Sequence, residues 1–94
     1  MDQHTQLKEF RQIIDAIDAE LLRLLAQRLA QTEQVGHYKH ANNLAVFDQQ
    51  RWRNVLETRL ALAGELGLSK EFVAALFEAI HAEALRIENE LKPS

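Results

Sequence analysis

The sequence has no cysteine, one proline and three glycines among its 94 residues. Without cysteine, disulfide bonds and thiolate metal sites are excluded. Because glycine and proline are scarce, few turns are available, and the hydrophobic residues that make up 47% of the chain must be organised by helices. We therefore expect an all-α protein with a single helical domain spanning residues 1–94.

The chain also lacks a basic excess and any block of like charges, since its net charge is −3 at pH 7. This balance argues against nucleic acid or an acidic membrane as the partner. No apolar run approaches the roughly 20 residues that cross a bilayer, and the first ten residues lack the basic start and apolar run of a signal peptide. We expect a cytoplasmic protein.

The first predicted helix carries apolar residues at three- and four-residue steps from Leu7 through Val35 and ends near His40. Gly36 weakens this pattern but need not break it. Asn42 and Asn43 follow, and asparagine suits the left-handed or capping geometry that ends a helix.

Two further helices are predicted from their N-caps. Asp48 begins a helix from about Gln49 to Gly64, and Ser69 begins another that ends near Leu91, before Pro93. The last helix is expected to bury its apolar face, which consists of Phe72, Val73, Leu76, Phe77, Ile80, Ala84 and Ile87.

A first helix of about 35 residues would be about 50 Å long, whereas a compact globule of this chain length has a radius of gyration of only about 12 Å. Its apolar stripe would remain exposed unless a second copy covered it, so an intertwined homodimer is expected. The alternative is a helix broken near Gly36, which would give a monomeric four-helix bundle.

Arg11, Arg28 and Lys39 lie on or beside this apolar stripe. Each could extend its charged end to water or pair with an acid such as Asp18 or Glu83. Several cations together instead suggest a dianionic ligand with bidentate partners. Since Arg11 lies about 25 Å along the helix from Arg28, it can reach the same small molecule only from a second chain.

The chain resembles the all-helical chorismate mutase family, in its short stand-alone form, over about residues 7–89. The resemblance is carried by the opening R..ID.ID.ELL.LL..R, the VG.YK step, the V.D..R restart and the closing LF.AIH.E..R. It implies a domain-swapped homodimer with two equivalent sites, rearrangement of chorismate to prephenate, and no metal or organic cofactor.

The same resemblance implies roles for the charged residues. Arg28 and Arg11, the latter from the other chain, would bind the two substrate carboxylates. Lys39 and Glu88 would hydrogen-bond the ether oxygen of the breaking bond. The site would also be lined by Asp48 and Arg51.

Three positions depart from the family pattern. Trp52 stands where many members have a glutamate that accepts from the ring hydroxyl, and Ala84 where a serine or threonine is usual. Trp52 and Phe47 are expected to form an apolar plug over the site. Glu88 replaces a glutamine, and only its protonated form can donate to the ether oxygen. Burial favours that form and nearby cations oppose it, so a rate that falls with rising pH is predicted. The alternative is that Glu88 turns outward to solvent.

Other functions remain open. The same scaffold suits a mutase acting on 4-amino-4-deoxychorismate or an isochorismate pyruvate-lyase, and a non-catalytic helical dimerisation or regulatory module is the alternative outside enzymes. The four cations Arg11, Arg28, Lys39 and Arg51 argue against that module, because a helical interface has no use for them. A metal site at His37 and His40 is disfavoured, since no third ligand accompanies them.

Overall fold

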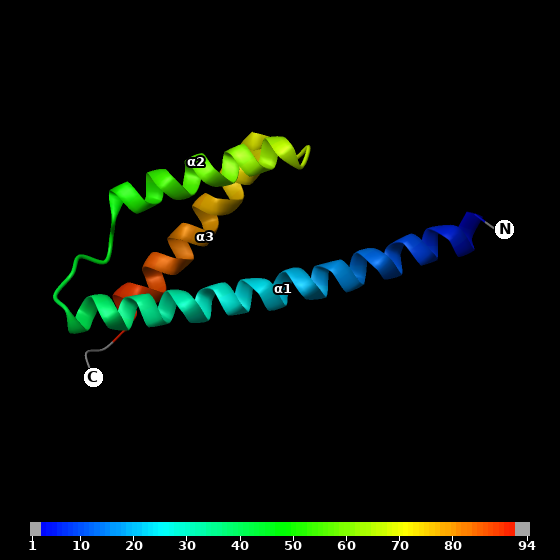
Figure 1. The fold of residues 1–94 in the computed structure, drawn as a ribbon. Coiled ribbons are helices and arrows are strands. Elements are labelled where there is room, and N and C mark those ends of the chain that lie inside the picture. The colour runs from blue at the N-terminus through cyan, green and yellow to red at the C-terminus, as the bar shows by residue number, and fades with distance from the viewer. Residues whose placement is uncertain (1–2, 92–94) are drawn as a thin grey trace. The chain divides into compact units, whose positions relative to one another are not determined.

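A computed structural model describes residues 3–91 and consists of helices α1 (Gln3–Ala41), α2 (Gln49–Glu65) and α3 (Lys70–Glu90) (Figure 1). Within that range there is no strand. The all-α prediction and the order of the three helices are therefore confirmed. Pro93, expected to follow the last helix, lies outside the described residues.

The chain divides into two compact units, one reaching to Gln31 and the other starting at Thr32. The first unit is the N-terminal part of α1. One row of its apolar side chains is 44–54% exposed, and we call it the α1 stripe. It consists of Leu7, Phe10, Ile14, Ile17, Leu21 and Leu24. These residues recur at three- and four-residue steps and so share a face of the helix. Within this chain, the stripe is thus an apolar surface open to solvent.

The second unit contains the last turns of α1 together with α2 and α3. Gly36 lies inside α1, so the alternative of a helix broken near this glycine was wrong. The helix ends where predicted, because Asn43 takes a left-handed conformation with φ 55°. The amide of Leu44 then donates to the carbonyl of Lys39 at 2.8 Å, which satisfies one of the last helical carbonyls.

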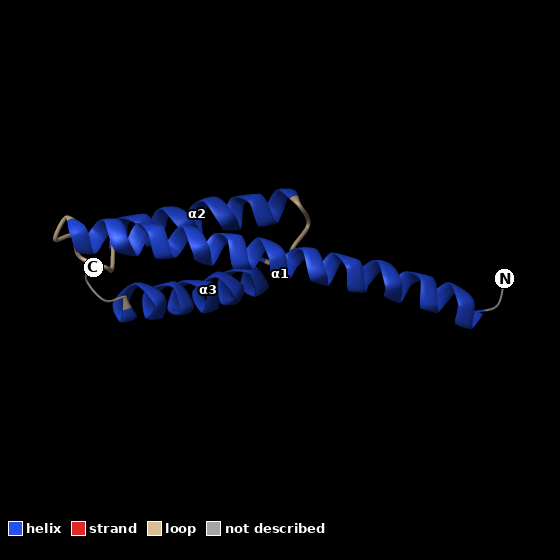
Figure 2. Ribbon diagram, turned by 90° about the horizontal axis from the view of Figure 1, so that it is seen from below, coloured by secondary structure: helices blue, strands red, loops and turns tan. Residues whose placement is uncertain are grey.

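Both remaining helices begin at the predicted caps. The Asp48 Oδ1 atom accepts from the backbone N–H of Arg51 at 3.0 Å, and the Ser69 Oγ atom accepts from that of Phe72 at 3.2 Å. Each cap satisfies an amide that the first helical turn leaves without a partner. A short turn joins α2 to α3, with Gly67 at φ +71° (Figure 2).

The core of this unit is small. Among the described residues, the buried hydrophobic side chains are Val55 and Ala63 of α2 and Val73 and Ala84 of α3. The prediction that Phe72 and Leu76 are buried was wrong, since they are 61% and 40% exposed. A single chain covers only one side of α3, so the apolar residues on its flank remain in contact with solvent. No helix among residues 3–91 is long and apolar enough to cross a membrane.

Candidate active site

An ion pair between α1 and α3 is the centre of the candidate site. Lys39 reaches from the last turn of α1, and its Nζ atom lies 3.1 Å from Oε1 of Glu88 near the end of α3. Only 18% of the Lys39 side chain and 7% of the Glu88 side chain are exposed. The alternative that Glu88 turns outward was therefore wrong, and neither Asp18 nor Glu83 is the acid beside Lys39.

The remaining contacts of these two residues fix them from several sides. The Lys39 ammonium donates to the carbonyl oxygen of Val46 at 2.6 Å, which ties α1 to the loop before α2. His40 Nε2 lies 2.8 Å from the carbonyl oxygen of Glu88. It thus provides a hydrogen-bond partner for one of the carbonyl groups that the last turn of α3 leaves unpaired. Glu88 Oε1 lies within ion-pair distance of Lys39 but accepts no well-aligned hydrogen bond from the described residues.

Gly36 allows α3 to approach α1 this closely. A Cβ atom at this position would lie 2.5 Å from Leu91 Cδ1 and 3.0 Å from Glu88 Cγ. Ordinary carbon contacts are about 3.5–4.0 Å, so only glycine fits here without displacing its neighbours. The VG.YK step thus brings the backbone of α1 against Glu88, one turn before Lys39.

The start of α2 brings the next predicted residues together. Asp48 is held in place by its capping bond to the Arg51 amide, and the Arg51 guanidinium donates to Asn54 Oδ1 at 3.0 Å. Asp48 and Arg51 are both exposed, so they remain accessible to a ligand. Because Asp48 follows Val46 by two residues, the loop that accepts from Lys39 leads directly into this cap.

An aromatic cluster links α2, α3 and the loop between α1 and α2. Trp52 stacks on His81 with ring centroids 4.0 Å apart and an interplanar angle of 10°. Phe47 packs against the same imidazole at 5.8 Å with an angle of 55°. Sequence reasoning named both aromatic residues but missed His81. The available signal was its spacing, seven residues before Glu88, which returns it to the same helix face.

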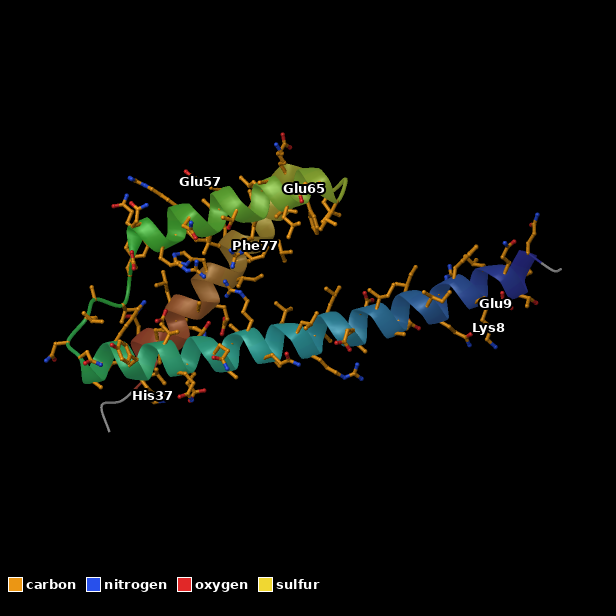
Figure 3. All side chains as sticks on the ribbon, in the orientation of Figure 1. Lys8, Glu9, His37, Glu57, Glu65 and Phe77 are labelled. Carbon is orange, nitrogen blue, oxygen red and sulfur yellow. The ribbon has the colours of Figure 1, made fainter. Side chains whose placement is uncertain are left out.

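Ala84 lies between His81 and Glu88 on this face of α3 and is buried. Phe77, labelled in Figure 3, begins the same row one turn earlier and is half-buried. The row therefore presents an apolar ring, an imidazole, a methyl group and a carboxyl group in succession. Ala84 has no hydroxyl, so at this position only the backbone can take part in hydrogen bonds.

Arg11 and Arg28 belong to the first unit. Arg11 is exposed on α1, whereas Arg28 is half-buried. The structure thus brings together Lys39 with Glu88, and Asp48 with Arg51, within the second unit. The participation of the two arginines of the first unit depends on the assembly proposed below.

Charges away from this cluster have ordinary surface partners. Arg86 pairs with Glu83 and Glu90 on exposed turns of α3, and its hydrogen bond lowers the pKa of Glu83 below the usual glutamate range. His37, on the exposed surface of α1, lies 3.6 Å from Glu33 (Figure 3). Among residues 3–91, no group of three or more His, Asp or Glu side chains is arranged to hold a metal ion.

Known proteins share this sequence pattern. The T-protein of Haemophilus influenzae is 32% identical over 84 residues, which cover 89% of this chain and 22% of that protein. The bifunctional chorismate mutase/prephenate dehydratase of Aquifex aeolicus is 32% identical over 90 residues, which cover 93% of this chain and 25% of that protein. The chain thus spans about a quarter of the length of these two relatives.

A third relative has a length similar to that of this chain. The 4-amino-4-deoxychorismate mutase of Streptomyces venezuelae is 25% identical over 89 residues, which cover 95% of this chain and 86% of that protein. The family described as chorismate mutase type II matches residues 10–89, a range that includes every predicted site residue. Because this match extends over most of the sequence, the chain belongs to the chorismate mutase type II family.

Proposed function

We propose that this chain is an isomerase that converts chorismate to prephenate. The proposal rests on family membership and, within the structure, on the buried pair of Lys39 and Glu88. It takes residues 1–94 as a single domain of an intertwined homodimer that works in the cytoplasm. It requires no metal and no organic cofactor.

The reaction suits a site of fixed charges. An intramolecular Claisen rearrangement breaks the ether C–O bond and forms a C–C bond in the same molecule, so the enzyme supplies neither a nucleophile nor a base. It has to hold the reactive conformer and stabilise the negative charge that grows on the ether oxygen. Lys39 is a suitable donor, because the Val46 carbonyl and Glu88 already fix the direction of its ammonium group.

Glu88 is proposed as the second donor to the ether oxygen. An ionised carboxylate beside that oxygen would oppose the developing charge, whereas the protonated acid donates a hydrogen bond. Two features support this role. The side chain is buried, and its Oε1 atom lacks a well-aligned hydrogen bond within the described residues.

The two carboxylates of the substrate need cationic partners in addition to Lys39, which is assigned to the ether oxygen. We assign them to Arg28 and to Arg11 of the partner subunit. The exposure of the α1 stripe supports this assembly, because its six apolar side chains are 44–54% exposed in the single chain. A second copy packed on this stripe would cover it and bring its own Arg11 to the site.

The remaining wall of the site is assigned to residues of α2 and α3. Asp48 and Arg51 provide polar groups at the start of α2, whereas Trp52 and Ala84 provide apolar surface. Apolar surface beside the substrate strengthens the electrostatic interaction between a developing charge and its donors, since it excludes water on that side.

A second candidate substrate is 4-amino-4-deoxychorismate. The relative from Streptomyces venezuelae named for that substrate aligns over 95% of this chain and 86% of its own length. The two substrates differ only in the substituent next to the ether-bearing carbon. The residues that contact this substituent therefore decide between them.

Turnover of chorismate by the purified chain, with the product identified by chromatography and mass, tests the proposal directly. We expect prephenate at both about pH 5 and about pH 7.5, formed faster at the lower pH. Turnover of the amino-substituted substrate alone would favour the second candidate. If neither substrate is turned over, the assignment as a mutase is wrong.

Lys39→Ala is the sharpest substitution for this assignment. Removal of a preorganised donor should lower kcat/KM by about a hundredfold or more. His37→Ala is the matched control, because His37 lies two residues away on the same helix and faces solvent. Its kcat/KM should remain within about twofold of the wild-type value, since exposed substitutions away from special features have small effects. Equal losses in the two variants would contradict the role of Lys39.

A further inference from the structure

A histidine of α1 contacts the backbone of the last turn of α3. His40 Nε2 lies 2.8 Å from the carbonyl oxygen of Glu88, 48 residues farther along the chain. A carbonyl oxygen can only accept, so this nitrogen carries a hydrogen and donates it. His40 is half-buried and Glu88 is buried, which shields the hydrogen bond from water. The bond therefore joins the end of one helix to the end of another.

The end of α3 differs from the ends of the other two helices. After α1 and α2 the chain turns back at a left-handed residue, and the amides of Leu44 and Leu68 donate to carbonyls of the preceding helix at 2.8 Å. Leu91, which follows α3, is extended instead, with φ −67° and ψ 131°. The carbonyl of Glu88 belongs to the last turn of α3, whose carbonyls have no partner inside the helix. His40 thus supplies from another helix the donor that a turn supplies elsewhere.

Glu88 is held by α1 at both its main chain and its side chain. His40 binds its carbonyl oxygen, and Lys39 Nζ lies 3.1 Å from its Oε1 atom. Its Cγ atom lies only 3.0 Å from the position that a Cβ atom on Gly36 would take. Helix ends fray, and a glutamate side chain has several rotatable bonds. The carboxyl group therefore keeps its place only while the backbone that carries it is held.

We propose that His40 is a positioning residue, which anchors the last turn of α3 and so keeps the carboxyl group of Glu88 where it can donate to the ether oxygen of the substrate. This inference rests on the proposed mutase function. It assigns His40 no contact with the substrate, because its Nε2 atom is engaged with the protein backbone.

His40→Leu and His40→Gln test this role. Leucine lacks a donor, whereas the amide nitrogen of glutamine is as many bonds from Cα as Nε2 of histidine. On the substrate that the wild-type chain turns over, we expect kcat of His40→Leu to fall about tenfold or more, with KM within about twofold of wild type. The reason is that a displaced donor weakens the transition state and leaves substrate binding intact. His40→Gln should keep kcat within about threefold of wild type.

His40→Asn and His37→Leu are the matched controls. Asparagine keeps the amide of glutamine on a shorter side chain that falls short of the Glu88 carbonyl, so it should lose as much kcat as leucine. His37→Leu introduces leucine at an exposed position of the same helix and should leave kcat and KM unchanged. Thermal melts verify that each variant is folded, and if His40→Leu is not, the comparison of His40→Gln with His40→Asn carries the test.

A double-mutant cycle separates positioning from packing. Glu88→Ala removes the carboxyl group but leaves the carbonyl that His40 binds. In this background, measured at raised enzyme concentration, His40→Leu should lower kcat by less than about twofold, because the group that it positions is already absent. A contribution of His40 to packing alone would lower kcat by the same factor in both backgrounds.

The possible outcomes separate this role from the proposed function. An unchanged kcat in His40→Leu, a loss that glutamine does not restore, or equal losses in the two backgrounds overturns the role of His40 and leaves the mutase assignment intact. Full activity of Glu88→Ala does the same, since His40 would then have no catalytic group to position. A wild-type chain that rearranges neither chorismate nor 4-amino-4-deoxychorismate overturns both.

Discussion

At the scale of single residues, the pair of Lys39 and Glu88 is costly to bury. Two charges that are buried lose hydration free energy, and their mutual attraction often does not compensate for this loss. A fold with two apolar side chains of similar volume at these positions is frequently as stable. The pair therefore contributes little net stability to the fold, although Glu88 is only 5% exposed. Under the proposed function, its value lies in two fixed groups that would face the developing negative charge of the substrate.

Glu88→Gln should flatten the pH dependence of turnover. Glutamine donates at every pH, whereas glutamate donates only when protonated, so the wild-type rate should fall as pH rises and the variant should be about tenfold faster than wild type at pH 7.5. Rates measured from about pH 5 to 8 check this.

Glu83→Gln is the control on the same helix. The hydrogen bond from Arg86 lowers the pKa of Glu83, so this carboxylate stays charged from pH 5 upward. Its ion pair with Arg86 is lost only when the pH falls through the lowered pKa. Its substitution should leave the profile of turnover unchanged. A profile that remains steep in Glu88→Gln would contradict the assignment of the pH dependence to Glu88.

Gly36→Ala should separate stability from turnover. Alanine favours a helix by about 1 kcal/mol over glycine, which offsets the strain against Leu91 and leaves stability within about 1 kcal/mol of wild type. Leu91 Cδ1 can rotate away, but Glu88 Cγ at 3.0 Å must shift with its carboxyl group. Because small misplacements in an active site are costly, we expect kcat to fall about tenfold or more.

Gly64→Ala gives the matched comparison, since its Cβ would meet only the Lys70 side chain, at 3.4 Å or beyond. This variant should gain stability and keep its turnover. Thermal melts and kinetics of both variants provide the readout. Unchanged turnover in Gly36→Ala would show that the close approach of α1 to α3 has no catalytic role.

Residue spacing was sufficient to predict that Lys39 and Glu88 face inward, because helical periodicity fixes the face of each side chain. It was insufficient to predict that Trp52 stacks on His81. That contact joins α2 to α3 and depends on how the two helices pack, which no periodicity within one helix encodes. The ion pair of Arg86 with Glu83 follows from spacing within one helix, because the two residues lie three positions apart on its surface. The acid that pairs with Lys39 is Glu88.

At the scale of helices, the first residues of α2 and α3 were predictable because short polar side chains accept hydrogen bonds from the backbone amides of the first helical turn. Asp48 and Ser69 each accept from the third following amide, and both helices begin where these residues stand. The buried face of α3 was less predictable. Periodicity identifies an apolar side, but Phe72 and Leu76 stay exposed because a single chain provides no neighbour to cover them.

Asp48 combines a cap with a proposed site position, and substitutions separate the two. Asp48→Ala should lower the free energy of unfolding by about 1 kcal/mol through loss of the cap, as should Ser69→Ala at the start of α3. Asp48→Ser keeps a capping oxygen and should retain stability. If Asp48 also lines the site, Asp48→Ser should still lower kcat/KM, and Ser69→Ala should not. Denaturant unfolding and kinetics of the three variants check this. Full activity in Asp48→Ser would show that Asp48 acts only as a helix cap.

At the scale of the whole molecule, the α1 stripe and the position of Arg11 point to the same assembly. Arg11 and Arg28 lie seventeen residues apart on the same helix, about 25 Å along its axis, so they reach one small ligand only if each comes from a different chain. Neither Arg11→Ala nor Arg28→Ala homodimers would then hold a complete site, and each should lose about a hundredfold or more in kcat/KM.

A mixture of the two inactive variants should regain activity. In a dimer with one chain of each kind, one site combines an intact Arg28 with an intact Arg11, while the other site lacks both. Random pairing after co-refolding gives mixed chains in half of the dimers, so activity should return to about a quarter of the wild-type value. Kinetics of the mixture, with the dimer mass verified by sedimentation, measure this directly. A mixture no more active than its separate components would place both arginines in the same chain's site, or outside it, and would contradict the shared site.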